Sequence, residues 1–214
     1  MEYYLSLWKK SGAGTKSFWL FLFVIVMLQV NLKAQERKLI YEVIRKGEVI
    51  GTINFEVQIK GNKTMLLMRS NVKTRFIFSF SDYCEEAATY EEGVMVYSSF
   101  YQKQNGSDKA NKITMACSDS YKLIDDGVTK VLRSAPIRYN MLLLYCAVPE
   151  NITKVYSDNY QKLLDLKKTG EHTYRLTLPD GNYNYYTYSG GVCSKVVIER
   201  PLFTLQFVLR DREQ

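Results

Sequence analysis

The single histidine of the sequence, His172, is the first residue to test for chemistry. It lies in the segment TGEHTYRL (169–176), at the start of an expected strand. A general base needs neighbouring groups that orient it, and the sequence reveals none for this side chain. One imidazole also cannot supply a multi-histidine metal site. We therefore expect His172 to be solvated, with no catalytic role and no metal bound to it.

Acidic residues that are adjacent in the sequence are the next candidates, because paired carboxylates can act as a general acid and base. Neighbours on a strand point to opposite faces of the sheet, and pairs in turns are solvated, so such pairs make poor dyads. The adjacent pairs are Glu85–Glu86, Glu91–Glu92 and Asp125–Asp126. The sequence also lacks the GxSxG, HExxH and P-loop motifs. We expect no catalytic residues and no cofactor, and an unrecognised hydrolase remains the minor alternative.

Four cysteines remain to be explained: Cys84, Cys117, Cys146 and Cys193. Their spacings of 33, 29 and 47 residues do not resemble CxxC, so zinc binding and thioredoxin-like chemistry are unsupported. In an oxidising compartment four cysteines allow three disulfide pairings, and the sequence does not choose among them. The alternative is that the cysteines are small buried apolar side chains.

The segment LPDGNYNYYTYSGGVCSKVVIE (178–199) contains two turns that predict the register of the strands around them. Pro179 and Gly181 fit a hairpin turn, and Gly190-Gly191 fits a two-residue turn. The first turn should pair Leu178 with Asn182, Leu176 with Asn184, Tyr174 with Tyr186 and Arg175 with Tyr185. The second should pair Ser189 with Val192, Tyr185 with Val196 and Tyr183 with Ile198.

This register divides the tyrosine-rich hairpins into two faces that both carry apolar residues, so both should be at least partly covered. One face should carry Tyr174, Leu176, Leu178, Tyr186, Tyr188, Cys193 and Val197, and the other Arg175, Tyr183, Tyr185, Val196 and Ile198. Arg175, Tyr183 and Tyr185 are the candidate ligand contacts, because a cation beside aromatic rings can hold an anionic headgroup. The alternative is that the tyrosines form cross-strand pairs that only stabilise the sheet.

The N-terminal residues have the features of a secretory signal peptide. Lys9, Lys10 and Lys16 precede the apolar segment FWLFLFVIVMLQVNL (18–32), and LKA (32–34) supplies a small residue for cleavage. A true membrane span needs about 20 apolar residues, and this segment contains Gln29 and Asn31. We expect residues 1–34 to be removed near Ala34. The alternative is an uncleaved anchor.

Export should therefore yield a soluble chain that begins at Gln35 or Glu36, in the periplasm or the outer cell envelope. N-terminal sequencing of the exported protein checks this prediction. An intact Met1 on membrane-bound protein would contradict it.

Removal of the signal peptide, residues 1–34, which we call the leader, also changes the charge of the protein. Residues 1–34 contain four lysines and one glutamate, so removing them lowers the formal net charge from +7 to +4. The lysines and glutamates of the remaining chain are interspersed, as on an ordinary solvated surface. We therefore expect no nucleic-acid partner, and contact with a membrane only through targeting.

The chain after the leader predicts one domain, residues 35–214, that consists of consecutive hairpins. In VIGTINFEVQI (49–59), four apolar residues alternate with polar ones, which is typical of a strand buried on one face. These core residues are Ile53, Phe55, Val57 and Ile59. Turn signals recur at 46–47, 61–62, 91–93, 105–108, 125–127, 168–170, 179–182 and 189–191. The spacing predicts an all-β antiparallel meander of about ten strands that curls into a barrel or half-barrel.

One segment, PIRYNMLLLYCAVPEN (136–151), breaks the strand pattern. It has good helix formers between two prolines, which predicts a short helix of about two turns around 138–147. We expect this helix to pack over one end or face of the sheet.

Three segments resemble a group of exported bacterial β-proteins of unknown function. They are YEVIRKGEVIGTINFEV (41–57), TRFIFSFSDYCEEAATYEEGVMVYSSFYQKQNG (74–106) and LPDGNYNYYTYSGGVCSKVVIE (178–199), and the similarity runs over most of residues 38–210. The resemblance implies an envelope location and a curved sheet like that of lipocalins or lipoprotein carriers. It transfers no catalytic residues.

Two functions follow from these features. The first is a non-catalytic envelope protein whose curved sheet binds a lipid or another apolar ligand, which would need an apolar hollow of about 300 Å³ or more. The second is a structural or protein-interaction module, which would have a filled core and an exposed sheet edge or apolar patch. The sequence does not predict the oligomeric state.

Overall fold

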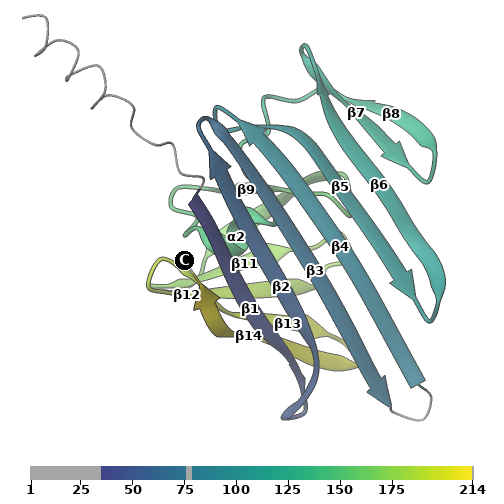
Figure 1. Ribbon diagram of the computed structural model, residues 1–214, viewed down its shortest axis with the longest axis vertical. Coiled ribbons are helices and arrows are strands. Elements are labelled where there is room, and N and C mark those ends of the chain that lie inside the picture. Colours follow the sequence, from purple (N-terminus) through teal and green to yellow (C-terminus); the bar gives the residue numbers. More distant parts are fainter. Residues whose placement is uncertain (1–34, 76–78, 214) are drawn as a thin grey trace, which may run out of the picture. The chain divides into compact units, whose positions relative to one another are not determined.

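The computed structural model describes residues 35–75 and 79–213, and Ala34–Gln214 form one compact unit with its own core (Figure 1). The expected leader lies outside the described residues. The elements are β1 (Gln35–Arg45), β2 (Glu48–Lys60), β3 (Lys63–Arg75), β4 (Ser79–Glu91), β5 (Val94–Gln104), β6 (Ser107–Cys117), β7 (Ser120–Asp125), β8 (Val128–Leu132), α2 (Leu143–Cys146), β9 (Lys154–Ser157), β10 (Lys162–Lys168), β11 (Thr173–Thr177), β12 (Tyr183–Ser189), β13 (Val192–Arg200) and β14 (Phe203–Glu213). No helix in these ranges is both long enough and apolar enough to cross a membrane.

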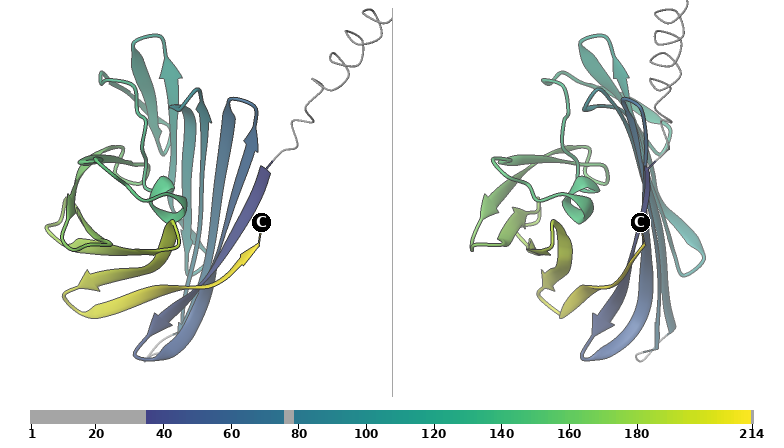
Figure 2. Two further views of the ribbon diagram at one scale, coloured as in Figure 1. Left: turned by 90° about the vertical axis from the view of Figure 1, so that its left-hand side faces the viewer. Right: turned by 60° about the vertical axis from the view of Figure 1, so that its left-hand side comes forward.

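All fourteen strands of the described ranges form one antiparallel sheet. Its order is β8-β7-β6-β5-β4-β3-β2-β1-β14-β13-β12-β11-β10-β9, so the first and last strands pair in the middle. Each half is a meander of hairpins, and the chain passes from one half to the other between β8 and β9. Figure 2 shows β9–β14 folded back over the concave face of the long strands. The sheet is therefore curled but not closed, and the predicted all-β antiparallel meander is confirmed.

The number of strands exceeds the expected ten because several turns carry no glycine. The predicted turns at Lys46-Gly47, Asn105-Gly106 and Asp126-Gly127 have positive φ at both residues, as two-residue hairpin turns of type I′ require. The turns that the sequence pattern missed include Ser118 and Gln161, which have positive φ without being glycine. Such positions carry a weaker sequence signal than glycine does.

The concave face of β2 carries the predicted core, with one exception. Ile53, Phe55 and Val57 are buried, whereas Ile59 is 38% exposed. Ile59 pairs with Gln35 near the end of the sheet, beyond the part that the second half of the chain covers. Alternation along a strand predicts which face a residue points to, but not where the covering layer ends.

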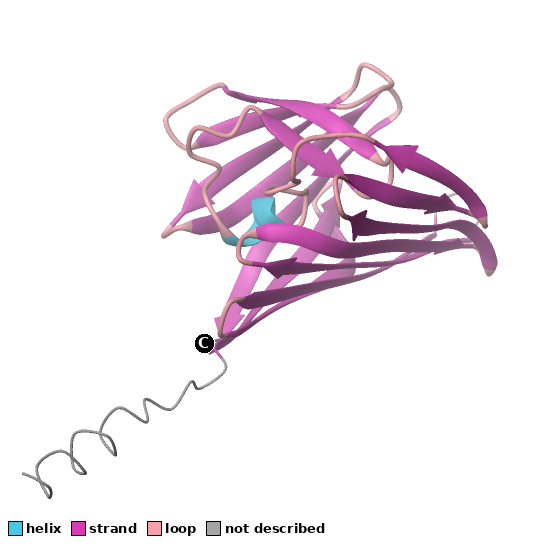
Figure 3. Cartoon of the chain, turned by 90° about the horizontal axis from the view of Figure 1, so that it is seen from above, coloured by secondary structure: helices cyan, strands magenta, loops and turns pink. Residues whose placement is uncertain are grey.

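The predicted helix is present as α2, a single turn rather than two. It lies inside the curl, between the two halves of the sheet (Figure 3). Tyrosine hydroxyls donate hydrogen bonds to its carbonyl oxygens: Tyr188 to Leu144 at 2.8 Å and Tyr41 to Tyr145 at 3.3 Å. Carbonyls at a helix C-terminus lack intrahelical partners, so these tyrosines satisfy them inside the core. The helix therefore packs against a face of the sheet, as expected, and we call it the plug helix.

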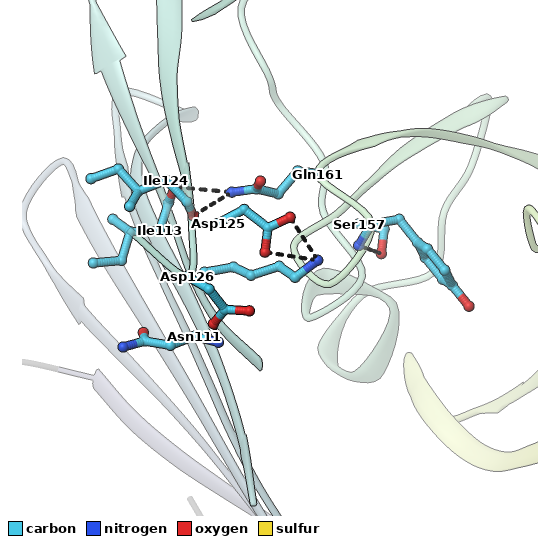
Figure 4. Close-up of polar contacts among 9 residues, drawn as sticks. Asn111, Ile113, Ile124, Asp125, Asp126, Ser157 and Gln161 are labelled. Carbon is cyan, nitrogen blue, oxygen red and sulfur yellow. Dashed lines mark hydrogen bonds and ion pairs between the residues drawn. The ribbon is translucent and has the colours of Figure 1, made fainter. Parts of the chain in front are cut away.

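Side-chain hydrogen bonds connect the two halves where no strand ladder does (Figure 4). Gln161, in the β9–β10 turn, donates from its amide to the carbonyl oxygens of Ile113 and Ile124, each at 3.1 Å. Nearby, the hydroxyls of Thr114 and Tyr156 lie 2.9 Å apart and are buried. These contacts hold the β9–β10 hairpin against β6 and β7.

Candidate ligand-binding site

An apolar hollow of about 300 Å³ lies at one end of the curled sheet. Its lining residues are Arg45, Ile50, Val72, Thr74, Phe80, Phe203 and Leu205. They come from the ends of β1 to β4 and from the start of β14, and the ladder registers place all of them except Ile50 on the concave face. The volume is at the lower end of the range for small-molecule pockets, and the lining has the mostly apolar character of such pockets.

Two local irregularities shape this hollow. A β-bulge in the β1–β2 ladder leaves Ile50 as an extra residue between Val49 and Gly51, and Ile50 lines the hollow. At Gly51 a Cβ atom would lie 2.3 Å from the carbonyl oxygen of Asn71, so only glycine fits there. A bulge changes which face a side chain points to, and alternation in the sequence does not reveal it.

Arg45 supplies a positive charge to the lining. Its guanidinium carbon lies 5.7 Å from the centre of the Phe203 ring, within cation–π distance. An apolar hollow with one cation in its lining fits a ligand that has an apolar part and an anionic group.

The predicted ligand contacts Arg175, Tyr183 and Tyr185 come together, but on the other face of the sheet. The Arg175 guanidinium lies 4.4 Å from the centre of the Tyr183 ring, and the two tyrosine rings are 6.4 Å apart. They alternate with the buried residues Tyr174 and Asn184 and are themselves half-buried. The cation and the aromatic rings are therefore adjacent as expected, and none of the three lines the apolar hollow.

The predicted register is right for the first hairpin. In the second it is right at the turn, where Ser189 pairs with Val192, and wrong by one residue beyond Cys193. Arg175 pairs with Tyr185, but Tyr185 pairs with Val197 and Tyr183 with Glu199. The cause is a β-bulge in the β12–β13 ladder, which inserts one residue after Cys193. Val196 is consequently in the core, and Val197 is on the half-buried outer face, the reverse of the expectation.

The other sequence candidates have no partners for chemistry. His172 is exposed, with Glu171 at 3.6 Å. All four cysteines are free thiols, so none of the three disulfide pairings is formed. Burial raises the pKa of the Cys146 thiol to about 11 and that of Cys193 to about 12, which keeps both protonated at neutral pH. Across the described ranges, no group of three His, Cys, Asp or Glu side chains could hold a metal ion.

A buried pair of carboxyl groups, Glu86 and Asp158, is the feature that sequence reasoning missed. Glu85 and Glu86 do point to opposite faces: Glu85 pairs with Arg69 outside, while Glu86 faces the core and is 6% exposed. There it meets Asp158, from the β9–β10 turn, which is 2% exposed. The amide of Asn140 donates to Asp158 at 2.9 Å. Only the curled fold brings together two acids that are so far apart in the sequence.

Burial raises the pKa of both carboxyls. The pKa of Asp158 rises to about 6 because of burial, although the neighbouring polar groups of Ser98, Glu86 and Asn140 oppose the rise. The pKa of Glu86 lies well above its ordinary value, because burial and the neighbouring Asp158 both disfavour its charged form. A substrate does not reach side chains that are this deeply buried, so we interpret the pair as a structural element that connects β4 with the second half of the sheet.

The curled antiparallel sheet, with its plug helix and one open apolar end, defines a β-barrel-like class of protein. The chain belongs to the family described as domain of unknown function DUF6134, which matches residues 41–210. This confirms the expected relationship to a β-protein family of unknown function. Comparison with curated proteins finds no match.

The fold is similar to that of a crystal structure of a β-barrel-like protein of domain of unknown function DUF1849 from Brucella abortus. The TM-score is 0.60 at 8% sequence identity, and the match covers 83% of this chain and 97% of that one. At this identity the similarity concerns the fold.

Proposed function

We propose that this protein is an exported, non-catalytic component of the cell envelope that binds a lipid or another apolar ligand in its curled sheet. The observation that supports this proposal is the apolar hollow of about 300 Å³ at the open end, with Arg45 in its lining. An apolar ligand that fills the hollow removes these apolar side chains from water. This burial lowers the free energy and so favours binding. The cation gives such a ligand a preferred orientation, with its anionic group beside Arg45 and the Phe203 ring.

Filling the hollow should weaken binding of an amphipathic probe. We expect the wild-type protein to bind dodecanoate, measured by displacement of the fluorescent anion anilinonaphthalene sulfonate. Thr74→Trp places a large side chain in the lining and should weaken binding at least tenfold. Thr52→Trp is the matched control, because Thr52 is exposed on β2 outside the lining, and it should bind as the wild type does.

The same assay separates the hollow from the cluster of Arg175, Tyr183 and Tyr185 as the ligand site. The double variant Tyr183→Ser, Tyr185→Ser removes both rings from the outer face and leaves the hollow lining intact. If this variant loses dodecanoate binding while Thr74→Trp binds normally, the ligand site is the cluster of Arg175, Tyr183 and Tyr185 and not the hollow. A wild-type protein that binds no probe would refute ligand binding in the hollow.

The alternative function, a structural or protein-interaction module, is favoured by a different observation. β8 is an edge of the sheet and its side chains are largely exposed, including Val131 at 66%. An exposed edge strand with apolar side chains can pair with a strand of another chain. This alternative predicts a filled site that takes up no probe, and complexes whose formation Val131→Lys prevents.

A further inference from the structure

The hairpin turn between β13 and β14 carries Leu202, the most exposed large apolar residue of the described ranges. Leu202 is 92% exposed and the adjacent Phe203 is 40% exposed. No residue of the described ranges covers the Leu202 side chain, and a polar residue is equally compatible with the backbone of such a turn. A single exposed apolar residue needs no explanation, but a group of them marks an interaction site.

Further exposed apolar side chains lie at the same end of the sheet. Phe80, near the start of β4, is 36% exposed on the concave face, and Val49, near the start of β2, is 55% exposed on the opposite face, where it pairs with Ile44. Phe80 and Phe203 are also lining residues of the apolar hollow, so the exposed patch is continuous with the hollow. Both views in Figure 2 place the β1–β2 and β13–β14 turns at one end of the molecule.

Basic residues accompany this apolar patch. Arg200 directly precedes the β13–β14 turn, and Arg45 and Lys46 lie at the β1–β2 turn. The Arg200 guanidinium donates to the carbonyl oxygen of Glu199 at 2.7 Å and to Asn184 Oδ1 at 3.2 Å, so it extends from β13 toward β12. The acidic residues around the patch are Glu48, Asp82 and Glu199, and Lys73 near the end of β3 adds a fourth basic residue, so cations outnumber anions by four to three. Projecting apolar side chains flanked by cations are the features with which a protein surface enters the interface of an anionic membrane.

We propose that the open end of the curled sheet docks on an anionic lipid bilayer, with Leu202 and Phe203 inserted among the lipids. The basic side chains would then lie at the level of the headgroups, and the mouth of the hollow would face the acyl chains. This inference rests on the proposed function, since it makes the bilayer the source or the acceptor of the ligand. It goes beyond the expectation that the protein meets membranes only through targeting.

Sedimentation with lipid vesicles tests the proposal. The protein from Gln35 onward, the compact unit, would be mixed with vesicles of equal parts phosphatidylglycerol and phosphatidylcholine, or of phosphatidylcholine alone. The wild type should bind the anionic vesicles more strongly than the neutral ones. Leu202→Asp should weaken that binding at least tenfold, because it removes the leucine that inserts among the lipids and adds a charge that the anionic lipids repel.

Val131→Asp is the matched control, since Val131 is also highly exposed but lies on the edge strand β8. It should bind vesicles as the wild type does, and circular dichroism should show that both variants are folded. The proposal is overturned if the wild type binds neither kind of vesicle, if Leu202→Asp binds normally, or if Val131→Asp loses as much binding as Leu202→Asp.

The dodecanoate assay distinguishes failure of this inference from failure of the proposed function. Probe binding without vesicle binding would reject membrane docking and keep the ligand site. Vesicle binding that depends on Leu202, without any probe binding, would keep the docking surface and reject the hollow as a ligand site.

Discussion

Replacing Phe55 by alanine should lower the free energy of unfolding by about 3–5 kcal/mol, the range for truncating a buried phenylalanine. Phe55 is fully buried, and its ring stacks on that of Tyr145 in the plug helix at 5.7 Å. Tyr145 in turn makes edge contacts with the rings of Tyr41 and Tyr186, one from each half of the sheet. Loss of the Phe55 ring would therefore leave a cavity where both halves and the helix meet.

Chemical denaturation of Phe55→Ala and Ile59→Ala measures this difference. Ile59 is on the same strand and continues the same alternation, but its partial exposure means that truncation removes fewer contacts. We expect Ile59→Ala to cost less than about 1 kcal/mol. A similarly small cost for Phe55→Ala would mean that this face of β2 is not the centre of the core.

The second large effect should be a loss of stability as the pH rises, caused by Glu86 and Asp158. Burial raises the pKa of both carboxyls in the folded protein, so the folded state binds more protons than the unfolded state at intermediate pH. Stability therefore falls with increasing pH wherever these protons are released. For Asp158 the fall runs from about pH 4 to about pH 6, and for Glu86 it continues to higher pH. A shift of two pKa units corresponds to roughly 3 kcal/mol.

Denaturation across the range from pH 6 to 8 separates the two acids. Glu86→Gln removes the group that titrates above Asp158, so the fall in stability above pH 6 should flatten in this variant. Glu85→Gln is the control, because Glu85 lies on the outer face beside Arg69, and that ion pair lowers its pKa instead. Glu85→Gln should keep the slope of the wild type above pH 6. An unchanged slope in Glu86→Gln would show that Glu86 is not the titrating group.

Much of the fold follows from local sequence patterns. The alternation of Ile53, Phe55 and Val57 determines which face of β2 is buried, and Gly-containing turns determine where most hairpins begin. The pairing of Arg175 with Tyr185 follows from the turn at Pro179 and Gly181. These features depend on residues that are close together in the chain, whose backbone preferences and side-chain directions are set by neighbouring atoms.

The candidate site depended on features without such a local signal. One bulge makes Ile50 an extra residue of β2 beside the hollow, and another moves Val196 into the core. The hollow itself needs the ends of β1 to β4 to meet the start of β14, and the acid pair needs β4 to meet the turn after β9. The sequence by itself determined strands, turns and most core faces, because these follow from short-range geometry. Only the curled tertiary structure decided which distant residues line one cavity and which two acids are buried together, because the pairing of β1 with β14 and the bulges set how far the sheet curls.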